Sequence, residues 1–535
     1  MTPALTPVQI EAALRAARAL HPFPPVTDRT AWSAIGAALE PGEADGWQAC
    51  AGQAAGGPPL PLTAADYLSD AYGAAQDGRR AALAALALAA CLEGDNRLLG
   101  PLLDHAWAVC EESAWDWPNP GGLPDPTAPH LDARAAHTAL ALAELDALLG
   151  PALPPALAAR IRFEVERRVI QPFMSRHDFA WMFSAGHEAT ACVAGVVGSA
   201  LYLEADAARL AEIVARGLWA LGDGLEQFDL RRWARGLASW ALLAHLLAAR
   251  TGGRVDLLAD AAGLARLPSL ARLGRGVYAG CPPADQPSAA LLSWLAQRFD
   301  QPEIARLAWE RRAAAPPQGQ SLPWALRDLL WRPGPEAAAP PQLPAHDWDA
   351  GLGWMTARFN PSDPDALALA VLGSHGLAVY CAGDLLIADA PLPLAAEQAA
   401  RPGATAALER QTTPAFDFVS LEVGATYPPE AGLISLRRVA ALHRSPPGGW
   451  VELVDGVLFE GTAHTLETTL VTRGGAALAP GVVVLDGQRA ALRIEYDPEQ
   501  ISARLEPEPD ASRVVFALHQ PRRSGAIRLK IEPAL

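Results

Sequence analysis

Apolar and alanine-rich stretches recur along residues 1–332, and within each one the apolar positions follow the three-and-four spacing of a helix. The pattern predicts helices at 82–92, 135–149, 192–203, 240–251 and 290–299. Their centres lie roughly 50 residues apart, a repeat length that fits one helical hairpin per unit. Each stretch ends in a polar or glycine break, such as Glu93-Gly94-Asp95.

These very apolar helices alternate with charged ones such as 156–170, which contains Arg160, Glu164 and Arg167. The alternation favours two concentric layers with the apolar helices inside, an (α/α) toroid, and a helical solenoid is the competing arrangement. The stretch 181–204 is the centre of the pattern. Its Gly195 and Gly198 lower helix propensity, which indicates close packing against another backbone.

The pattern changes after residue 332. Residues 333–344 are rich in proline and form a stiff linker. Short strand-like runs follow at 354–359, 366–372, 377–380, 385–387, 418–423, 434–439, 450–454, 466–471, 482–485, 491–496, 514–518 and 527–531. Asp455-Gly456 and Asp486-Gly487 are typical turn dipeptides. We therefore expect an α+β multidomain protein, with a helical domain over 1–332 and an antiparallel β-sandwich over 345–535.

Composition narrows the possible partners. Half of the 535 residues are apolar, so the chain can bury a large core. The net charge of −16 opposes binding to nucleic acids, anionic membranes and highly sulfated polymers, but it does not exclude a polyanion at a locally basic cleft. The start of the chain predicts an amphipathic helix, with Thr6 as its cap and Pro7 in the first position, and not a signal peptide. Without any stretch long and apolar enough to span a bilayer, a cytoplasmic location is expected.

No cofactor or metal is expected. The six cysteines are scattered and lie mostly in apolar helix patterns, which indicates reduced core thiols. His375, His443 and His464 have no compact ligand spacing. The Gly-Gly pairs lack the residues that a phosphate-binding loop requires.

Two groups of residues are candidates for chemistry. His187 and Glu188 form the only adjacent His–Glu pair, either in a cleft or simply at the start of a helix, where a glutamate suits the dipole. Trp115 and Trp117 lie in 111–129, which is too rich in proline and glycine to be helical. Paired tryptophans can stack on sugar rings, and they can equally fill the core at a helix end.

Several stretches resemble segments of heparinase II/III-like polysaccharide lyases. These are CEESAWDWP with the following LPDP and LDARAAHTALAL, then RIRFEVERRVIQPFMSRHDFAWM, CVAGVVGSALYLEAD, and TYPPEAGLISLRRVAALHR with WVELVD. The resemblance implies a toroid carrying a β-sandwich. It also implies β-elimination at a uronic acid, in which one group neutralises the carboxylate, a Tyr or His removes the C5 proton, and an acid protonates the leaving oxygen.

The three catalytic regions of that family are altered here. Counting back from Cys192, His187 stands where relatives have the neutralising Asn. The loop that holds the catalytic Tyr looks shortened, and no Tyr occurs between Tyr202 and Tyr278. The third region keeps one His, His375. By resemblance, the candidate catalytic residues are His187, Glu188 and His375.

Further residues are candidates for binding a saccharide. Arg231, Arg232 and Arg235 stand in place of the shortened loop. They are either the solvated face of a helix or a site for a carboxylate, which a guanidinium group binds with two hydrogen bonds. The candidate saccharide-binding residues are Trp115, Trp117, Trp181, Arg231 and Arg235.

We therefore expect a lyase-fold protein with weak or no lyase activity that binds an acidic, uronate-containing oligo- or polysaccharide. Loss of the base and its partner removes proton transfer steps that each contribute about 10²–10⁴-fold. One alternative is an active lyase that uses His187, Glu188 and His375 or Tyr380. Another is a glycoside hydrolase, which needs two carboxylates such as Glu188, Glu226 or Asp229 on either side of a bond. The oligomeric state stays open.

Overall fold

The computed structural model describes residues 5–17, 22–39, 42–69, 71–94, 96–117, 122–183, 186–222, 232–259, 261–282, 285–311, 320–332, 344–373, 376–399 and 407–534. The chain forms two compact units, the first consisting of Met1–Phe228, Arg235–Ala265 and Pro287–Ala337. The second consists of Asp229–Ala234, Arg266–Gln286 and Ala338–Leu535. The two short segments Asp229–Ala234 and Arg266–Gln286 differ from the sequence expectation, because they group with the later part of the chain and not with the helices around them.

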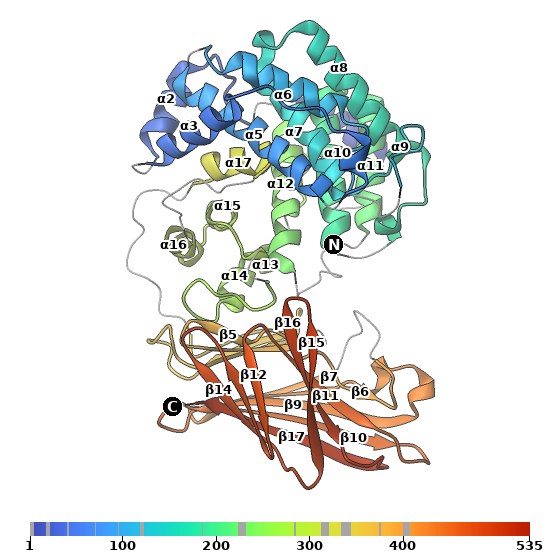
Figure 1. Ribbon diagram of the computed structural model, residues 1–535, viewed down its shortest axis with the longest axis vertical. Helices are drawn as coiled ribbons and strands as arrows, with labels where there is room; N and C mark the ends of the chain where they lie inside the picture. The colour runs from blue at the N-terminus through green and yellow to red at the C-terminus, as the bar shows by residue number, and fades with distance from the viewer. Residues whose placement is uncertain are drawn as a thin grey trace. The chain divides into compact units, whose positions relative to one another are not determined.

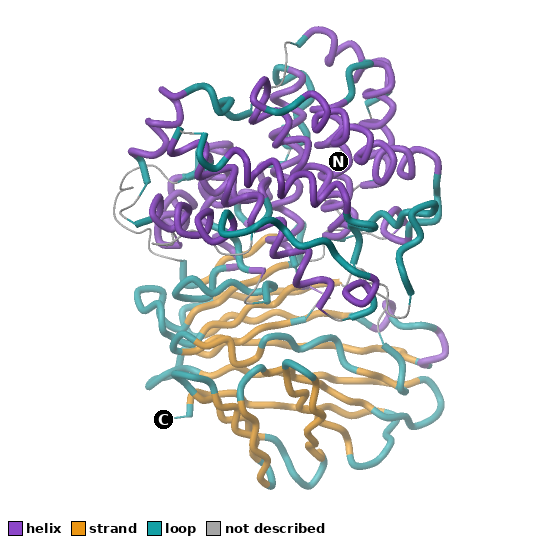
Figure 2. The backbone as a smooth tube through the Cα atoms, turned by 45° about the horizontal axis from the view of Figure 1, so that its top comes forward, coloured by secondary structure: helices purple, strands orange, loops and turns teal. Residues whose placement is uncertain are grey.

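Helices make up the first unit and strands make up most of the second (Figures 1 and 2). The helices of the first unit are α1 (Pro7–Ala16), α2 (Arg29–Ala37), α3 (Glu43–Ala54), α4 (Ala64–Tyr67), α5 (Ala71–Glu93), α6 (Leu99–Glu111), α7 (Ala133–Leu149), α8 (Pro155–Val165), α9 (Gln171–Ser175), α10 (His187–Leu203), α11 (Ala207–Leu221), α12 (Trp233–Thr251), α13 (Ala262–Ala265), α15 (Ala289–Phe299), α16 (Pro302–Arg311) and α17 (Leu322–Leu330). The short helix α14 (Leu267–Ala271) belongs to the second unit, as do the first two residues of α12, Trp233 and Ala234. Each of the five predicted helices is confirmed, and α1 is capped by Thr6 with Pro7 at its first position.

Helices α5, α7 and α10 run parallel to one another. A Cβ placed on Gly195 of α10 would lie 2.5 Å from the carbonyl carbon of Ala136 in α7. One turn later, a Cβ on Gly198 would lie 3.0 Å from Leu140 Cδ1. The residue number therefore increases in the same direction along both helices, which shows that they are parallel. The two glycines therefore permit the close approach that the sequence indicated.

The same reasoning places α5 beside α7 in the same direction. Arg134 Nη1 donates to Gln76 Oε1 at 3.0 Å, and Arg80 Nε donates to Thr138 Oγ1 at 3.0 Å. Each pair again advances by four residues in both helices. These parallel helices, α5, α7 and α10, are called the inner helices below.

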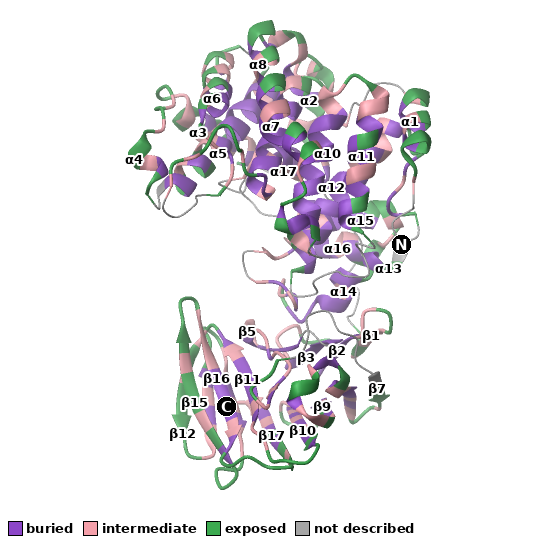
Figure 3. Cartoon of the chain, turned by 90° about the vertical axis from the view of Figure 1, so that its right-hand side faces the viewer, coloured by how far each residue is buried: buried purple, intermediate pink, exposed green. Residues whose placement is uncertain are grey.

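The helices between the inner ones run the other way and keep one exposed face. Gly217 of α11 packs against Val193 and Val197 of α10, whereas Trp219, later in α11, contacts Phe183, which precedes α10. Every residue of α10 from Ala189 to Leu201 is buried, whereas α11 buries one side only (Figure 3). This is the predicted alternation of inner apolar helices with outer amphipathic ones.

Because the helices alternate in direction, the short connections lie at one end of the inner helices and the long connections lie at the other. The connections that leave the inner helices, 94–98, 150–154 and 204–206, are short. The segments that lead into inner helices, 112–132 before α7 and 176–186 before α10, are much longer. Long segments therefore gather at the end where the inner helices begin.

The strands of the second unit form three antiparallel sheets. They are β1 (His346–Asp349), β2 (Trp354–Arg358), β3 (Ala368–Leu372), β4 (Leu377–Cys381), β5 (Asp384–Ile387), β6 (Leu394–Ala395), β7 (Ala407–Thr412), β8 (Phe416–Glu422), β9 (Leu433–His443), β10 (Trp450–Phe459), β11 (Leu466–Thr472), β12 (Gly475–Ala479), β13 (Val482–Asp486), β14 (Ala491–Glu495), β15 (Ile501–Glu508), β16 (Ala511–Leu518) and β17 (Ser524–Pro533). The sheet orders are β1-β2-β3-β4-β5, β12-β13-β14-β17-β10-β9-β8-β7 and β15-β16-β11-β6. Residues from all three sheets, such as Val379, Leu453 and Phe516, share one apolar core.

The two turn dipeptides have different outcomes. Asp486-Gly487 lies where β13 turns into β14, as predicted. The prediction of a turn at Asp455-Gly456 is wrong, because both residues lie inside β10. Asp455 is buried and accepts two hydrogen bonds from Arg438 at 2.7 and 2.8 Å, so an ion pair stabilises an aspartate within the sheet.

All six cysteines are free thiols, and all but Cys50 are buried, which confirms the sequence interpretation. No helix among the described residues is long and apolar enough to cross a membrane. Within the same residues, no group of three or more His, Cys, Asp or Glu side chains is arranged to hold a metal ion.

Candidate functional site

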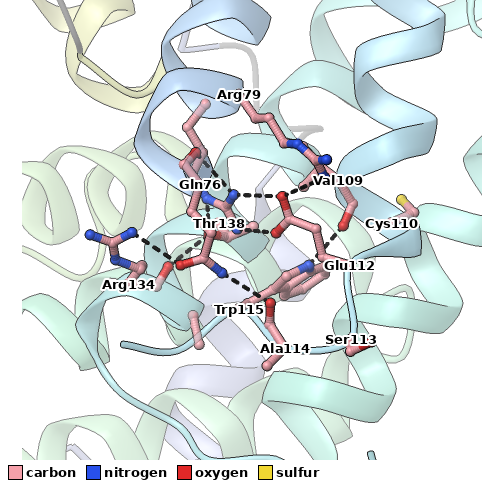
Figure 4. Close-up of polar contacts among 12 residues, drawn as sticks. Gln76, Arg79, Val109, Cys110, Glu112, Ser113, Ala114, Trp115, Arg134 and Thr138 are labelled. Atoms are coloured by element: carbon pink, nitrogen blue, oxygen red, sulfur yellow. Dashed lines mark hydrogen bonds and ion pairs between the residues drawn. The ribbon is translucent and has the colours of Figure 1, made fainter. Parts of the chain in front are cut away.

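The segment between α6 and α7 is held by a buried ion pair. Glu112, the first residue after α6, accepts hydrogen bonds from Arg80 Nη1 at 3.0 Å and Arg80 Nη2 at 2.7 Å, and from Arg79 Nη1 at 3.2 Å (Figure 4). Both arginines belong to α5. Because the Glu112 and Arg80 side chains are almost fully buried, this contact fixes the start of the segment against α5.

The next residues are held through their backbone. The carbonyl oxygen of Ala114 accepts hydrogen bonds from Tyr72 Oη at 2.8 Å and from Gln76 Nε2 at 3.0 Å. The backbone N–H of Ser113 donates to Tyr67 Oη at 2.7 Å. Burial raises the pKa of Tyr72 above the ordinary range. Tyr72 is thus a structural phenol, and the free phenolate that a general base requires is disfavoured.

The two tryptophans of this segment have different roles. Trp115 is 2% exposed, its Nε1 donates to the Val109 carbonyl oxygen at 2.9 Å, and the Arg168 guanidinium lies over its ring at 4.7 Å. Trp115 therefore fills the core, the alternative that the sequence left open. Trp117 is 55% exposed, and the Arg134 guanidinium lies 3.7 Å from its ring centroid. Of the pair, only Trp117 has an exposed ring, one face of which the Arg134 guanidinium covers.

A cavity of about 190 Å³ opens within this segment, entirely in the first unit. It is lined by Tyr67, Tyr72, residues 113–117, residues 122–125, residues 128–130, Ala135, Arg167 and Arg168. The walls combine aromatic rings with carboxylates and guanidinium groups. Aromatic walls combined with polar groups are typical of small-molecule sites.

Asp116 is the unusual titratable group of the cavity. Burial, and next the charge of Asp132, raise the pKa of Asp116 to about 6. Asp132 is committed to structure, because its two oxygens accept the backbone N–H groups of Trp117 at 2.7 Å and of Ala135 at 2.8 Å. Within the described residues, the carboxylate of Asp116 accepts no hydrogen bond from another residue. A half-buried carboxylate without such a donor is suited to receive one from a ligand.

The guanidinium groups of the cavity are bound by protein. Arg167 donates to Glu164 at 2.7 Å and to the Pro126 carbonyl oxygen at 3.0 Å. Arg168 donates to Glu164 at 2.7 Å and to the Cys110 carbonyl oxygen at 3.1 Å. One nitrogen of Arg168, Nη1, is buried and has no hydrogen-bond partner within the described residues.

The predicted catalytic pair lies at the same end of the inner helices. His187 is the first residue of α10, and Glu188 is exposed in its first turn, as expected for a glutamate near a helix start. Gly195 and Ala136 are in contact, but α10 has more residues before this contact than α7 has, so α10 begins about 7 Å before α7 at the same end of the two parallel helices. Since Asp116 and Trp117 also precede α7, His187 and the cavity lie at one end of the first unit.

The remaining predicted residues are placed as follows. Trp181 is 3% exposed and its Nε1 donates to the Leu131 carbonyl oxygen at 2.7 Å, so it positions the start of α7 and offers almost no surface to a saccharide. Arg235 is exposed in the first turn of α12. Burial, and next the charge of Arg235, lower the pKa of His137 to about 4. Arg231 and His375 lie outside the described residues, as do Glu226 and Asp229.

Tyr380, the alternative base of the second unit, is engaged in structure. Its hydroxyl donates to the Pro364 carbonyl oxygen at 2.8 Å and accepts from the Arg275 backbone N–H at 3.4 Å. Burial raises its pKa above the ordinary value. Both features oppose proton abstraction by this phenol.

Asp116 was not among the residues singled out from the sequence. The available signal was its place between two tryptophans in a segment free of helix. Its unusual environment depends on Asp132 and on burial, neither of which a local pattern reveals.

Comparisons with known proteins give a fold but no close relative. No family model and no curated protein matches the sequence. A solved structure of heparinase III is similar with a TM-score of 0.50 at 10% identity, over 91% of this chain and 84% of the heparinase. The chondroitin AC lyase of Streptomyces coelicolor A3, solved in complex with chondroitin sulphate, has a TM-score of 0.49 at 11% identity, over 99% of this chain and 83% of the lyase. The chain therefore has a polysaccharide lyase-like fold, a helical N-terminal region followed by an antiparallel sheet-rich region.

Proposed function

We propose that this protein binds an acidic, uronate-containing saccharide on a lyase-like fold and has weak or no lyase activity. The observation that carries the proposal is the exposed ring of Trp117 beside the cavity, at the end where the inner helices begin. An exposed indole next to hydrogen-bonding groups suits a sugar ring, which has an apolar face and a polar edge. The heparinase-like fold supports a saccharide as the ligand class.

The proposal that the ligand is acidic is based on the groups near the end where the inner helices begin. Arg235 is exposed at the start of α12, and His187 begins α10. A guanidinium group and the amino-terminal ends of helices both favour an anionic group, by about 0.3–1 kcal/mol for a helix end at the surface. These groups are the proposed contacts for a uronate carboxylate.

Weak or absent elimination is supported by the tyrosines, because a tyrosine is a usual base in the lyases that this sequence resembles. The sequence has no tyrosine in the segment between Tyr202 and Tyr278. The phenols of Tyr72 and Tyr380 donate to backbone carbonyl oxygens and have raised pKa values. A missing general base lowers a rate by about 10²–10⁴-fold.

The glycoside hydrolase alternative finds no support in the cavity. Inversion and retention both need two carboxylates that face the scissile bond. The cavity brings Asp116 near Asp132, but both oxygens of Asp132 accept backbone hydrogen bonds. A second carboxylate free to act is thus missing from this pair.

Binding is tested with the purified full chain and a panel of alginate, heparan sulfate and chondroitin, by calorimetry or affinity electrophoresis. Trp117→Ala should weaken binding about tenfold, which corresponds to about 1.4 kcal/mol. Trp107→Ala is the matched control, because Trp107 is another exposed tryptophan that contacts an arginine and lies outside the cavity. Equal affinities for both variants, or no binding of any polymer to the unaltered protein, would contradict the proposal.

Elimination is tested by ultraviolet absorbance of the unsaturated uronate product on the same panel. No rise is expected at high protein concentration and several pH values. A rise that His187→Ala abolishes would instead make His187 part of a working lyase site.

A further inference from the structure

The cavity contains a hydrogen-bond acceptor and a hydrogen-bond donor that the described protein leaves unused. The acceptor is the Asp116 carboxylate. The donor is Arg168 Nη1, an atom of a lining residue that is enclosed in this conformation, so a ligand reaches it only after a small movement of the Arg168 side chain. Arg168 is 5% exposed and, like Asp116, lines the cavity. Buried polar atoms without partners are rare in folded proteins, and each costs about 1–3 kcal/mol. A ligand that supplies both partners would recover that free energy.

A sugar hydroxyl can satisfy both atoms, because it donates one hydrogen bond and accepts others. An ammonium group can only donate, and a carboxylate can only accept. Neighbouring hydroxyls on one ring could thus bind Asp116 and Arg168 together. The ring of Trp117 beside them suits the apolar face of the same sugar.

The charges around the cavity argue against a second anion there. The lining cations Arg167 and Arg168 both donate to Glu164. Two carboxylates line the cavity. Asp125 accepts hydrogen bonds from Thr127 Oγ1 at 2.6 Å and from the Thr127 backbone N–H at 2.8 Å, so Asp116 is the carboxylate that remains for a ligand. A uronate carboxylate at Asp116 would bring like charges together in a partly desolvated place.

We propose that this cavity binds one uncharged sugar residue through its hydroxyl groups, held between Asp116, Arg168 and the ring of Trp117, and rejects a uronate. The inference rests on the proposed saccharide function and makes it more specific. The uronate of a bound chain would then contact the groups near Arg235 and His187, and a neutral residue would enter the cavity.

The test compares two ligands that differ at one carbon, methyl β-glucoside and methyl β-glucuronide, with methyl β-galactoside and methyl α-mannoside as stereochemical variants. Saturation-transfer NMR and calorimetry at pH 7.5 give the affinities for the full chain. At least one neutral glycoside should bind tenfold or more tightly than the glucuronide. Glucuronide binding as tight as that of the best neutral glycoside, or no glycoside binding at 50 mM, would overturn the proposal.

Two variants locate the effect. Asp116→Asn removes the charge but keeps an acceptor, so the preference for neutral sugars should fall at least fivefold. Asp206→Asn is the control, because Asp206 is a carboxylate of the first unit that lies outside the cavity and accepts the Ala208 backbone N–H, and the preference of this variant should equal that of the unaltered protein. An unchanged preference in Asp116→Asn would also overturn the proposal.

The polymer panel separates this inference from the function beneath it. If polymers bind to the unaltered protein and no neutral glycoside is preferred, only the specificity of the cavity is wrong. If neither polymers nor glycosides bind, saccharide binding itself is wrong.

Discussion

Gly195 of α10 lies directly against the backbone of Ala136 in α7. A Cβ on Gly195 would lie 2.5 Å from the Ala136 carbonyl carbon and 2.6 Å from its oxygen. These atoms are backbone and cannot rotate away as a side chain does. The hydrogen atom of Gly195 therefore sets the distance between two inner helices.

Gly195→Ala should lower the stability of the protein. The methyl group would push α7 and α10 apart, and overpacking of a tight core costs about 1–3 kcal/mol or more. Chemical denaturation followed by circular dichroism measures the change. Gly78→Ala in α5 is the control, because a Cβ there meets nothing within 4 Å. Alanine should stabilise that exposed helical position by up to about 1 kcal/mol. Equal effects at both glycines would contradict the packing argument.

Glu112→Gln should strongly destabilise the first unit. The substitution leaves Arg80, which is 5% exposed, without its charge partner, and a broken buried ion pair costs about 3–5 kcal/mol. Denaturation in urea measures the loss. Glu11→Gln provides a comparison, because Glu11 pairs with Arg15 on the surface of α1. That exposed pair contributes about 0–1 kcal/mol, so a similar loss in both variants would mean that the Glu112 contact is not a buried ion pair in solution.

Asp116 should make the protein less stable as the pH rises from about 4 to about 6. Its pKa is about 6 in the fold and 3.8 in the unfolded chain, so between these values the folded state binds more protons. Stability then falls with rising pH, by about 1–3 kcal/mol for a half-buried group. Asp328 also has a pKa raised to about 6 by burial, and the quantity to measure is therefore the difference from Asp116→Asn. That variant should gain stability relative to the unaltered protein above pH 6. A difference that does not depend on pH would show an ordinary pKa for Asp116.

The cysteines should react slowly with a thiol reagent in the native protein. Burial raises the pKa of Cys91 and Cys110 to about 12 and that of Cys381 to about 11, so little thiolate is present near neutral pH. Only Cys50 is not buried. Titration with a chromogenic disulfide should therefore give at most one fast thiol before denaturation and six after it. Several fast thiols in the native state would mean that the helical core opens readily.

The inner helices could be predicted because packing leaves a strong mark on their sequences. A helix buried on every side needs small and apolar residues throughout, as in α10, and the two glycines reveal the closest contact. The hairpin period then indicates the two-layer arrangement. The weakly apolar edge strands β12 and β15 escaped prediction because most of their side chains are exposed.

The candidate site could be predicted only in part. Trp117 was identified from its position in a proline-rich segment, but the sequence could not separate it from Trp115, which is buried. The path of the segment that contains both tryptophans depends on Glu112, which contacts Arg79 and Arg80 more than 30 residues away along the chain. For the same reason Asp455-Gly456 resembled a turn, since the partner that keeps Asp455 within a strand is Arg438, on another strand.

The placement of long segments at one end of the inner helices has a consequence for how such a protein can change. Insertions and deletions in 122–128, which leave the buried Glu112, Trp115 and Asp132 in place, would alter the groups presented at that end without moving the helices, since the packing of α7 on α10 depends on residues farther along each helix. The short connections at the opposite end allow no such variation without changing the layers. The packed helices thus maintain the fold, whereas the connecting segments can change in sequence and length. A change in the chemistry at that end therefore requires no new fold.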